Sequence, residues 1–263
     1  MMADGAGTGR TALAFGIRAW SAWADGLQAQ DDWRAWSAAP HLPPALAQAP
    51  PLPELAAMLR RRLPLLGRVA LASAYACAYP EAGHAQVPAV FASRHGDTAR
   101  LVTMLSGLAA AEPLSPTAFG LAVHNAIGAV RSIDLADMNN LQALSAGRDT
   151  VETAVLEACS LVADGAPEVM LVHYEAPLAE PYAAFADEPG CLYSWCWRIG
   201  APRAGEPWYT LSRADEADEA DPGAAAPAAR LPHGLDVLRF MLAGDTGLRH
   251  RGERATWQWR RHG

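Results

Sequence analysis

The sequence predicts an α/β fold in which a sheet of mostly parallel strands lies between layers of helices. Apolar runs typical of buried strands, such as Val87–Ser93 and Glu168–Tyr174, alternate with segments of helical periodicity as far as residue 174. This alternation is typical of a layered α/β domain with a largely parallel sheet. The chain has 263 residues, 51% of them hydrophobic, which is enough to bury a sizeable core as one large domain or two small ones.

The first part of the chain contains one predicted strand and one predicted helix. Residues 1–10 are expected to be disordered, and Thr11–Trp23 has the aromatic residues and the alternation of a strand. Prolines crowd residues 38–54, which indicates an extended surface loop. Leu55–Ala78 is rich in Ala, Leu and Arg, which favours a helix, and Pro64 should break it.

The middle of the chain contains the most apolar predicted helix. Thr98–Ala111 follows the first buried strand and has leucines at helical spacing. Ser115 and Pro116 then have the signature of a helix start, with Ser as the cap and Pro in the first turn. Ala118–Val130 is so apolar that we expect one continuous helix that is buried on most sides.

A short strand and a long helix flank a glycine in the next segment. Leu141–Leu144 is a predicted strand that leads into Gly147, and Asp149 or Thr150 caps a helix that ends at Gly165. The apolar residues of this helix fall on one face: Val151, Ala154, Val155, Ala158, Cys159 and Val162. Its charged residues, Glu152 and Glu157, are expected to be solvated.

The C-terminal part of the chain contains aromatic strands and a low-complexity segment. Cys191–Ile199 and Pro207–Leu211 are predicted strands rich in Trp and Tyr. Residues 214–230 consist mostly of Ala, Asp, Glu and Pro, which is typical of a mobile linker. Leu235–Leu242 is a predicted short helix, and Ala255–Arg260 alternates like a final edge strand.

These elements divide the chain into four parts. Residues 1–10 form a disordered N-terminus and residues 11–212 the main domain. Residues 213–231 form the low-complexity linker, and residues 232–263 contain a helix and a strand that pack back on the domain.

Composition argues against several classes of function. The formal net charge is -7, with 21 basic and 28 acidic residues, whereas nucleic-acid binders usually carry a basic patch. No apolar run approaches the ~20 residues of a membrane span, and no signal-peptide pattern is present, so we expect a cytoplasmic protein. The chain has no Walker A loop, no HExxH motif and no GxSxG elbow, and we expect neither a cofactor nor a metal ion.

The cysteines and tryptophans are expected to serve packing. The spacing of the four cysteines matches neither a zinc ribbon nor a CxxC redox pair, so we interpret them as reduced core residues: Cys77, Cys159, Cys191 and Cys196. Two pairs of tryptophans alternate within predicted strands, which places each pair on one face of the sheet: Trp195 with Trp197, and Trp257 with Trp259.

Several short motifs, taken in order, resemble the N-terminal half of β-ketoacyl synthases. They begin with Arg94-His95-Gly96 after a strand, Pro113–Phe119, and Val123-His124-Asn125-Ala126. The chain resembles most of all the short chain-length-factor proteins found with aryl polyene clusters. The resemblance continues through further segments: Ala143–Gly147, Asp149–Ala158, Val169–Pro177, Tyr182 and Trp257-Gln258-Trp259.

The resemblance implies half of a thiolase-like fold with a short C-terminal remnant, and it places Gly147 where these enzymes carry the nucleophilic cysteine. Glycine has no side chain and forms no thioester, although a ketosynthase needs a thiolate for acyl transfer. The nearest cysteine along the chain, Cys159, lies ~18 Å away by helical rise. We therefore expect a subunit without a catalytic residue of its own.

The resemblance also implies a partner. Such a subunit forms a heterodimer with an active β-ketoacyl synthase and limits the length of the chain that the pair builds on acyl carrier protein. Phe119 and Val123 are the candidates for side chains that block the shared acyl tunnel. His124 and Asn125 are placed near the tunnel or the interface, or else are hydrogen-bonded inside a core helix. The loop residue Arg94 is expected to pair with an acidic group.

Two other hypotheses stay open at this stage. The chain is a divergent acyltransferase or ketosynthase that uses Cys77, Cys159 or a histidine as its reactive group. Alternatively, it is a homo-oligomeric module that binds acyl carrier protein without catalysis.

Overall fold

The computed structural model describes residues 12–45, 48–77, 86–214 and 230–263. The predicted disorder of residues 1–10 lies outside the described residues, and so does most of the linker predicted at residues 213–231.

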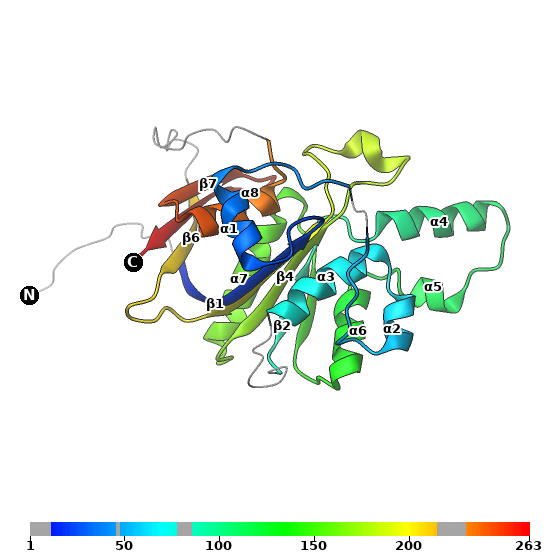
Figure 1. Ribbon diagram of the computed structural model, residues 1–263, viewed down its shortest axis with the longest axis horizontal. Helices are drawn as coiled ribbons and strands as arrows, with labels where there is room; N and C mark the ends of the chain where they lie inside the picture. The colour runs from blue at the N-terminus through cyan, green and yellow to red at the C-terminus, as the bar shows by residue number, and fades with distance from the viewer. Residues whose placement is uncertain (1–11, 46–47, 78–85, 215–229) are drawn as a thin grey trace, which may run out of the picture.

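The helices alternate with strands in the first two thirds of the chain (Figure 1). The helices are α1 (Gln30–Ala38), α2 (Ala57–Arg62), α3 (Leu65–Ala76), α4 (Thr98–Ala109), α5 (Pro116–Gly120), α6 (Ala126–Leu135), α7 (Thr150–Ala163) and α8 (His233–Ala243). Two short 3₁₀ turns are η1 (Gly147–Asp149) and η2 (Tyr182–Phe185). The strands are β1 (Leu13–Ala24), β2 (Ala89–Ala92), β3 (Leu141–Leu144), β4 (Val169–Glu175), β5 (Tyr193–Gly200), β6 (Trp208–Ala214), β7 (Gly247–Arg251) and β8 (Thr256–His262).

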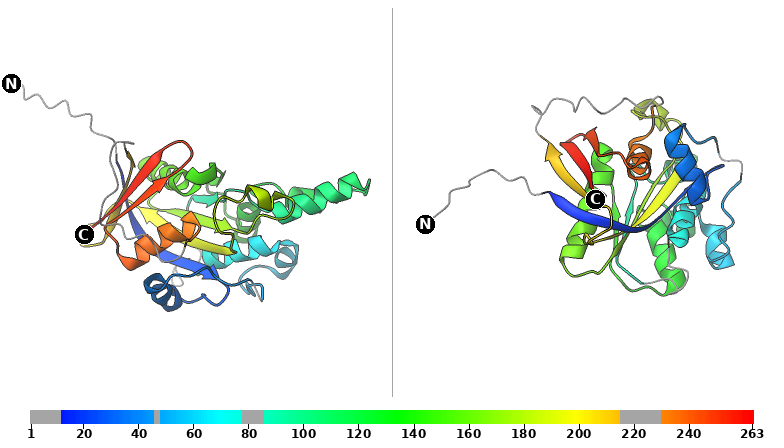
Figure 2. Two further views of the ribbon diagram at one scale, coloured as in Figure 1. Left: turned by 90° about the horizontal axis from the view of Figure 1, so that it is seen from above. Right: turned by 60° about the vertical axis from the view of Figure 1, so that its left-hand side comes forward.

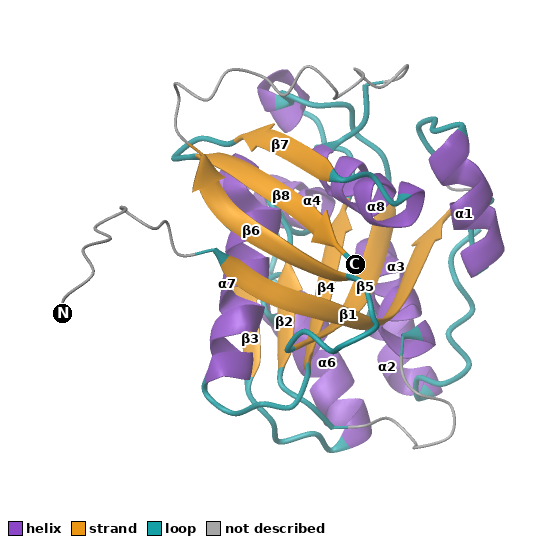
Figure 3. Ribbon diagram, turned by 90° about the vertical axis from the view of Figure 1, so that its left-hand side faces the viewer, coloured by secondary structure: helices purple, strands orange, loops and turns teal. Residues whose placement is uncertain are grey.

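The described strands form one sheet in the order β3-β2-β4-β5-β1-β6-β8-β7 (Figure 3). The expected α/β fold is confirmed, but the expectation of a mostly parallel sheet is wrong. Only β2 pairs in parallel, with β3 and β4, and the other described pairs are antiparallel. Parallel pairs need a long crossover, which α4–α6 and α7 supply, whereas the antiparallel neighbours β4 and β5, and likewise β7 and β8, follow one another without an α-helix between them.

Two hydrophobic cores lie on the two faces of the sheet. On one face α7 and α8 pack over the strands, and α1 packs beside α8. On the other face α3 packs on β1, β4 and β5, and α6 packs on β2 and β3. Strand β4 is buried along its whole length, which confirms the prediction of a central strand.

The predicted packing residues are in these cores. All four cysteines are free and buried. Trp195 and Trp197 stack with their ring centroids 4.4 Å apart, and Trp259 meets Trp197 edge to face. The apolar face of α7 is largely buried, as predicted. The expected break at Pro64 is also confirmed, because α2 ends before it and α3 begins after it.

The C-terminal segment differs from the prediction in one respect. Strand β8 is not at the edge, because β7 lies outside it. Strand β7 has the sequence Gly-Leu-Arg-His-Arg, whose single large apolar residue, Leu248, does not make the alternation that marks a strand. Helix α1 was also not predicted, although its Trp33 and Trp36 are buried against each other and the core.

The expectation of one continuous helix over Ala118–Val130 is wrong. The chain forms the short helix α5, turns, and starts again as α6, although the Ser115 side chain caps α5 as expected. None of the residues of α4 or α5 is buried, and Phe119 is 61% exposed. Helix α4 extends away from the body of the molecule (Figure 2), so its apolar residues are left uncovered by the described chain.

None of the described helices combines the length and the apolar character needed to cross a membrane.

Candidate functional site

Position 147 lies in η1, immediately before α7. Gly147 has φ +57°, a left-handed conformation that residues with a Cβ rarely adopt. A Cβ built there would lie 2.7 Å from Cδ of Glu253 and closer still to Oε1. Backbone conformation and the Glu253 carboxylate therefore both disfavour a side chain at this position.

Asp149 anchors the C-terminal hairpin over the start of α7. Its carboxylate accepts hydrogen bonds from the backbone N–H groups of Glu253 and Arg254, at 2.9 and 3.0 Å, and from Trp257 Nε1 at 2.6 Å. The Glu253 carboxylate in turn accepts a bond from the Arg148 N–H at 3.2 Å. The turn between β7 and β8 thus holds the Glu253 carboxylate against Gly147 and Arg148.

All four cysteines are buried, and burial disfavours the thiolate form of three of them. Burial raises the pKa of the Cys159 thiol and of the Cys191 thiol to about 12 each, and it raises the pKa of Cys196 well above its ordinary value. Cys77 Sγ donates to the Cys196 carbonyl at 3.5 Å. Because the thiolate is the reactive form, buried thiols with raised pKa values are inert at neutral pH.

Two imidazoles converge beside position 147. His233 at the start of α8 and His250 on β7 stack with centroids 3.3 Å apart and an interplanar angle of 13°. His233 Nε2 lies 2.6 Å from Glu152 Oε1, and His250 Nε2 donates to the Arg148 carbonyl at 2.7 Å. The expectation that Glu152 is solvated is wrong, because it is fully buried between α7 and the C-terminal segment.

The pKa values of these three side chains reflect both their burial and the charges of their neighbours. Burial alone raises the pKa of Glu152, but the neighbouring His233 and the bonds from His233 and Trp259 outweigh it and leave the pKa lowered. Burial lowers the pKa of His233, and Glu152 outweighs it, so the pKa is raised. Burial and the charge of His233 lower the pKa of His250. The cluster therefore contains one buried ion pair and one neutral imidazole, and His, His and carboxylate are also metal ligands.

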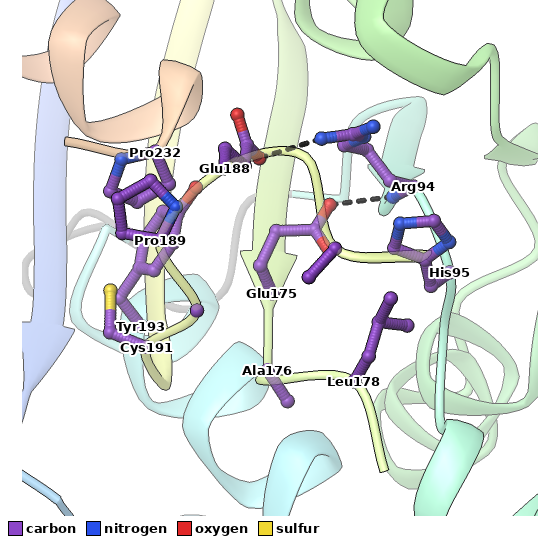
Figure 4. A pocket seen from close by; sticks show the side chains of 12 residues that line it. Arg94, His95, Glu175, Ala176, Leu178, Glu188, Pro189, Cys191, Tyr193 and Pro232 are labelled. Atoms are coloured by element: carbon purple, nitrogen blue, oxygen red, sulfur yellow. Dashed lines mark hydrogen bonds and ion pairs between the residues drawn. The ribbon is translucent and has the colours of Figure 1, made fainter. Parts of the chain in front are cut away.

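A small pocket lies at the end of β4 (Figure 4). Its volume is about 30 Å³, and Glu175 and Tyr193 line it. Burial raises the pKa of Glu175 to about 8, although its carboxylate accepts bonds from the Arg94 N–H at 2.5 Å and from Ser93 Oγ at 3.3 Å. His173 is buried beside Tyr193, and burial lowers its pKa to about 3, so it is neutral.

Arg94 covers this pocket with an ion-pair network. Its guanidinium pairs with Asp187 at 3.0 Å and with Glu188 at 2.9 Å, which confirms the expectation that it meets acidic groups. The pocket is too small for an acyl group, and most of its polar groups bind one another, so it offers no substrate site.

The predicted tunnel residues lie near α4 and α5. Val123 and His124 line a groove of about 230 Å³ together with His95 and Leu101. His124 Nε2 lies 3.0 Å from the Leu144 carbonyl, to which it donates. Asn125 is exposed at the start of α6 and makes no capping bond with its side chain. Phe119 is exposed and lines neither this groove nor the one described next.

A second groove of about 520 Å³ is continuous with the first through their shared residues Pro64 and Asp97. It is mostly apolar and lies between α3 and α4, with Leu65, Met104 and Ala118 in its walls. We call the surface made of both grooves and the exposed apolar residues of α4 and α5 the α4–α6 surface. Its exposed apolar members are Leu65, Leu101, Leu105, Leu108, Leu114, Phe119 and Val123.

The two edges of the sheet differ in charge. Strand β3, with the sequence Leu-Gln-Ala-Leu, has no charged residue and is half-buried. Strand β7 at the other edge carries Arg249, His250 and Arg251. Charged side chains on an edge strand discourage pairing with another sheet, and an uncharged edge permits it.

A family model for the β-ketoacyl synthase N-terminal domain matches residues 33–260, which is most of the chain. The chain belongs to this family. The resemblance read from the sequence motifs is confirmed. No curated protein sequence matches the chain.

Solved ketosynthase structures share the fold. One is a chain of the complex between the ketosynthase ApeO and its chain length factor ApeC from Xenorhabdus doucetiae. It is 27% identical with a TM-score of 0.73, and the match covers 94% of this chain and 99% of that chain. A chain of the ishigamide ketosynthase/chain length factor is 14% identical with a TM-score of 0.60, covering 78% and 68% of the two chains. A β-ketoacyl synthase from Burkholderia phymatum STM815 is 11% identical with a TM-score of 0.53, covering 73% and 60%. The latter two likenesses show the fold alone, and the expected thiolase-like ketosynthase fold is confirmed.

Sequence reasoning missed the cluster of Glu152, His233 and His250. The three residues are separated by 81 and 17 positions, and no motif connects them. The role of Glu253 was also missed, because only the register of the β7–β8 hairpin brings it to Gly147.

Proposed function

We propose that this β-ketoacyl synthase homologue is a non-catalytic chain length factor. It pairs with an active ketosynthase and shapes the tunnel in which an acyl chain grows on acyl carrier protein. The observation that carries the proposal is position 147, the expected place of the nucleophile, where the backbone of Gly147 is left-handed and the Glu253 carboxylate leaves no room for a side chain. A thiolate cannot be accommodated there without moving the β7–β8 hairpin.

The structural matches support a partner role. One match covers nearly the whole of a chain from a ketosynthase–chain length factor complex. Another structural neighbour, 8% identical, comes from a complex of a type II polyketide acyl carrier protein with its ketosynthase.

The α4–α6 surface and the β3 edge supply the proposed contact with the partner. The surface is apolar and has no cover within the described residues, and large exposed apolar patches mark protein interfaces. The β3 edge is the uncharged end of the sheet and adjoins this surface through the His124 bond to Leu144. Phe119 and Val123 would then face the partner and limit the length of its acyl tunnel, with His124 and Asn125 at the interface.

The decisive experiment is reconstitution. The chain is co-expressed with a ketosynthase encoded beside it, and the purified pair is supplied with acyl carrier protein and malonyl units. We expect a one-to-one complex that elongates chains, and we expect replacement of the partner's active-site cysteine to abolish activity.

Variants of this chain complete the test. Cys77→Ala and Cys159→Ala should leave elongation intact, because both thiols are buried. Elongation by the chain alone, or its loss in one of these variants while the pair still assembles, would support the enzyme hypothesis instead. A stable homo-oligomer that retains acyl carrier protein in size-exclusion chromatography would support the carrier-binding hypothesis.

A further inference from the structure

We infer that Glu152, His233 and His250 form a binding site for one divalent transition-metal ion, with zinc as the ion that the ligands suit best. The site is independent of the proposed role as a chain length factor. The three side chains come from α7, from the start of α8 and from β7. One ligand atom of each lies within 4.8 Å of those of the other two.

An unpartnered oxygen points to a cation. Glu152 is fully buried, and its Oε1 accepts a bond from Trp259 Nε1 at 3.0 Å and lies 2.6 Å from His233 Nε2. Its Oε2 is buried and has no hydrogen-bond partner. A buried carboxylate oxygen without a donor is costly, and native proteins rarely leave one unsatisfied. A metal ion bound to Oε2 would remove this cost.

The groups around the three side chains are those that orient metal ligands. His250 donates through Nε2 to the Arg148 carbonyl, which leaves Nδ1 as the ring atom that would bind the ion. Trp259 fixes the Glu152 carboxylate through Oε1. Ligating histidines commonly donate their other N–H to a carbonyl, and ligating carboxylates are themselves hydrogen-bonded.

The stacked rings are compatible with this site after a small movement. Bonds of ~2.1 Å to a tetrahedral zinc ion place neighbouring ligand atoms about 3.4 Å apart. The present separations of up to 4.8 Å exceed this value by little more than ~1 Å, and a tilt of the two rings brings the atoms together. Two imidazoles and one carboxylate leave the fourth position for water, a ligand set found in zinc sites.

The alternative is that His233 and Glu152 form a structural ion pair and that no metal ion binds there. The test uses the full-length chain without an affinity tag, kept dispersed in a non-ionic detergent, stripped by a chelator and titrated with Zn²⁺ alone. Competition with a chromophoric chelator should show one equivalent bound, and Mg²⁺ should not compete. X-ray absorption of the zinc-loaded chain should show two imidazoles bound to the ion.

Matched variants locate the ion. Replacing half-buried His250 by Gln should weaken zinc binding at least ~100-fold, since even changes to residues that only orient a ligand cost about 10–100-fold. His262→Gln, a histidine that stacks on Trp208, should leave binding unchanged. Because Glu152→Gln risks misfolding of the buried site, Co²⁺ absorption of the wild-type chain serves as the second readout and should show a four-coordinate spectrum. Absence of binding, coordination without two imidazoles, or equal binding in His250→Gln would overturn the inference.

Discussion

Two properties of a single residue, Gly147, act against a side chain at its position. At position 147 the left-handed backbone and the Glu253 carboxylate act together, and they can be separated because other glycines share only the first property. Gly205 has φ +79°, and a Cβ added there would meet no atom within 4 Å, so it isolates the effect of the backbone alone. Any additional loss of stability in Gly147→Ala, compared with Gly205→Ala, then comes from the contact with Glu253.

We expect Gly147→Ala to destabilise the chain more than Gly205→Ala. The backbone strain costs roughly 1–2 kcal/mol at either position. The collision with Glu253 should add at least about 1 kcal/mol, as is usual for overpacking. Urea unfolding of both variants measures the difference. The extra loss should vanish in the Glu253→Ala background, and equal losses in the two glycine variants would argue against the contact.

The pKa of Glu175 predicts how stability depends on pH. The folded pKa is about 8 and the ordinary value is 4.5, so the folded state holds a proton that the unfolded state releases between these values. The contribution of this group to stability is therefore full below pH 4.5 and is lost as the pH rises through 8. Between about pH 5.5 and 8.5 the loss should be on the order of 3 kcal/mol.

The variant Glu175→Gln removes this titration. Its amide oxygen still accepts from the Arg94 N–H, so the local bonds are largely kept. We expect its unfolding free energy to change less between about pH 5.5 and 8.5 than that of the wild type. Chemical denaturation at the two pH values provides the comparison, and parallel pH profiles would refute the assignment.

At the level of elements, the residues of the α4–α6 surface are as apolar as those of a hydrophobic core, but they are exposed. A sequence pattern records that residues are apolar but not which molecule covers them. For that reason the segment 118–130 was predicted as one buried helix, although α5 and α6 are separate and Phe119 is exposed. The elements that pack within the chain, such as α7 and β4, were predicted with nearly their observed bounds.

Elements whose pairing depends on distant segments were harder to predict. The antiparallel part of the sheet arises because β1 inserts between β5 and β6, and no local pattern encodes that neighbour. Strand β7 is polar and was missed for the same reason. The Glu152 cluster could not be predicted because it needs three elements to meet. The place of Gly147 between a strand and a helix was predicted, because both elements are local, and its role stays a prediction.

If α5 limits the partner's tunnel, then shortening its side chains should lengthen the product. We expect Phe119→Ala in the reconstituted pair to shift the product distribution towards longer chains, because the tunnel gains the volume of the ring. Mass spectrometry of the carrier-bound products measures the shift. Leu156→Ala, an exposed apolar residue on α7, is the control and should not change chain length. An unchanged distribution in Phe119→Ala would exclude this residue from the tunnel.

For the whole molecule, the distribution of exposed apolar residues indicates how it behaves without a partner. Ten of the thirteen large apolar residues that are exposed in the described chain lie between residues 58 and 138. Several of them lie on α4, which extends from one side of the molecule. We therefore expect the chain to aggregate when produced alone and to remain in solution when co-expressed with its ketosynthase.

A charged residue introduced on α4 should have opposite effects on the solubility of the chain and on its affinity for the partner. Leu105→Glu is expected to raise the soluble fraction of the chain alone and to weaken the complex at least ~10-fold, because a carboxylate would be buried at the interface. Leu156→Glu on α7 should leave the affinity unchanged. Light scattering and affinity measurements on the same preparations give both quantities, and a monodisperse wild-type monomer would contradict the expectation.

The unequal edges of the sheet have a consequence for assembly. A neighbour can continue the hydrogen-bonding ladder from β3, but the arginines of β7 resist such an addition. Growth in one direction only ends as soon as a single neighbour has docked. If the proposed partner pairs with β3, these two edges therefore favour a closed pair over a filament.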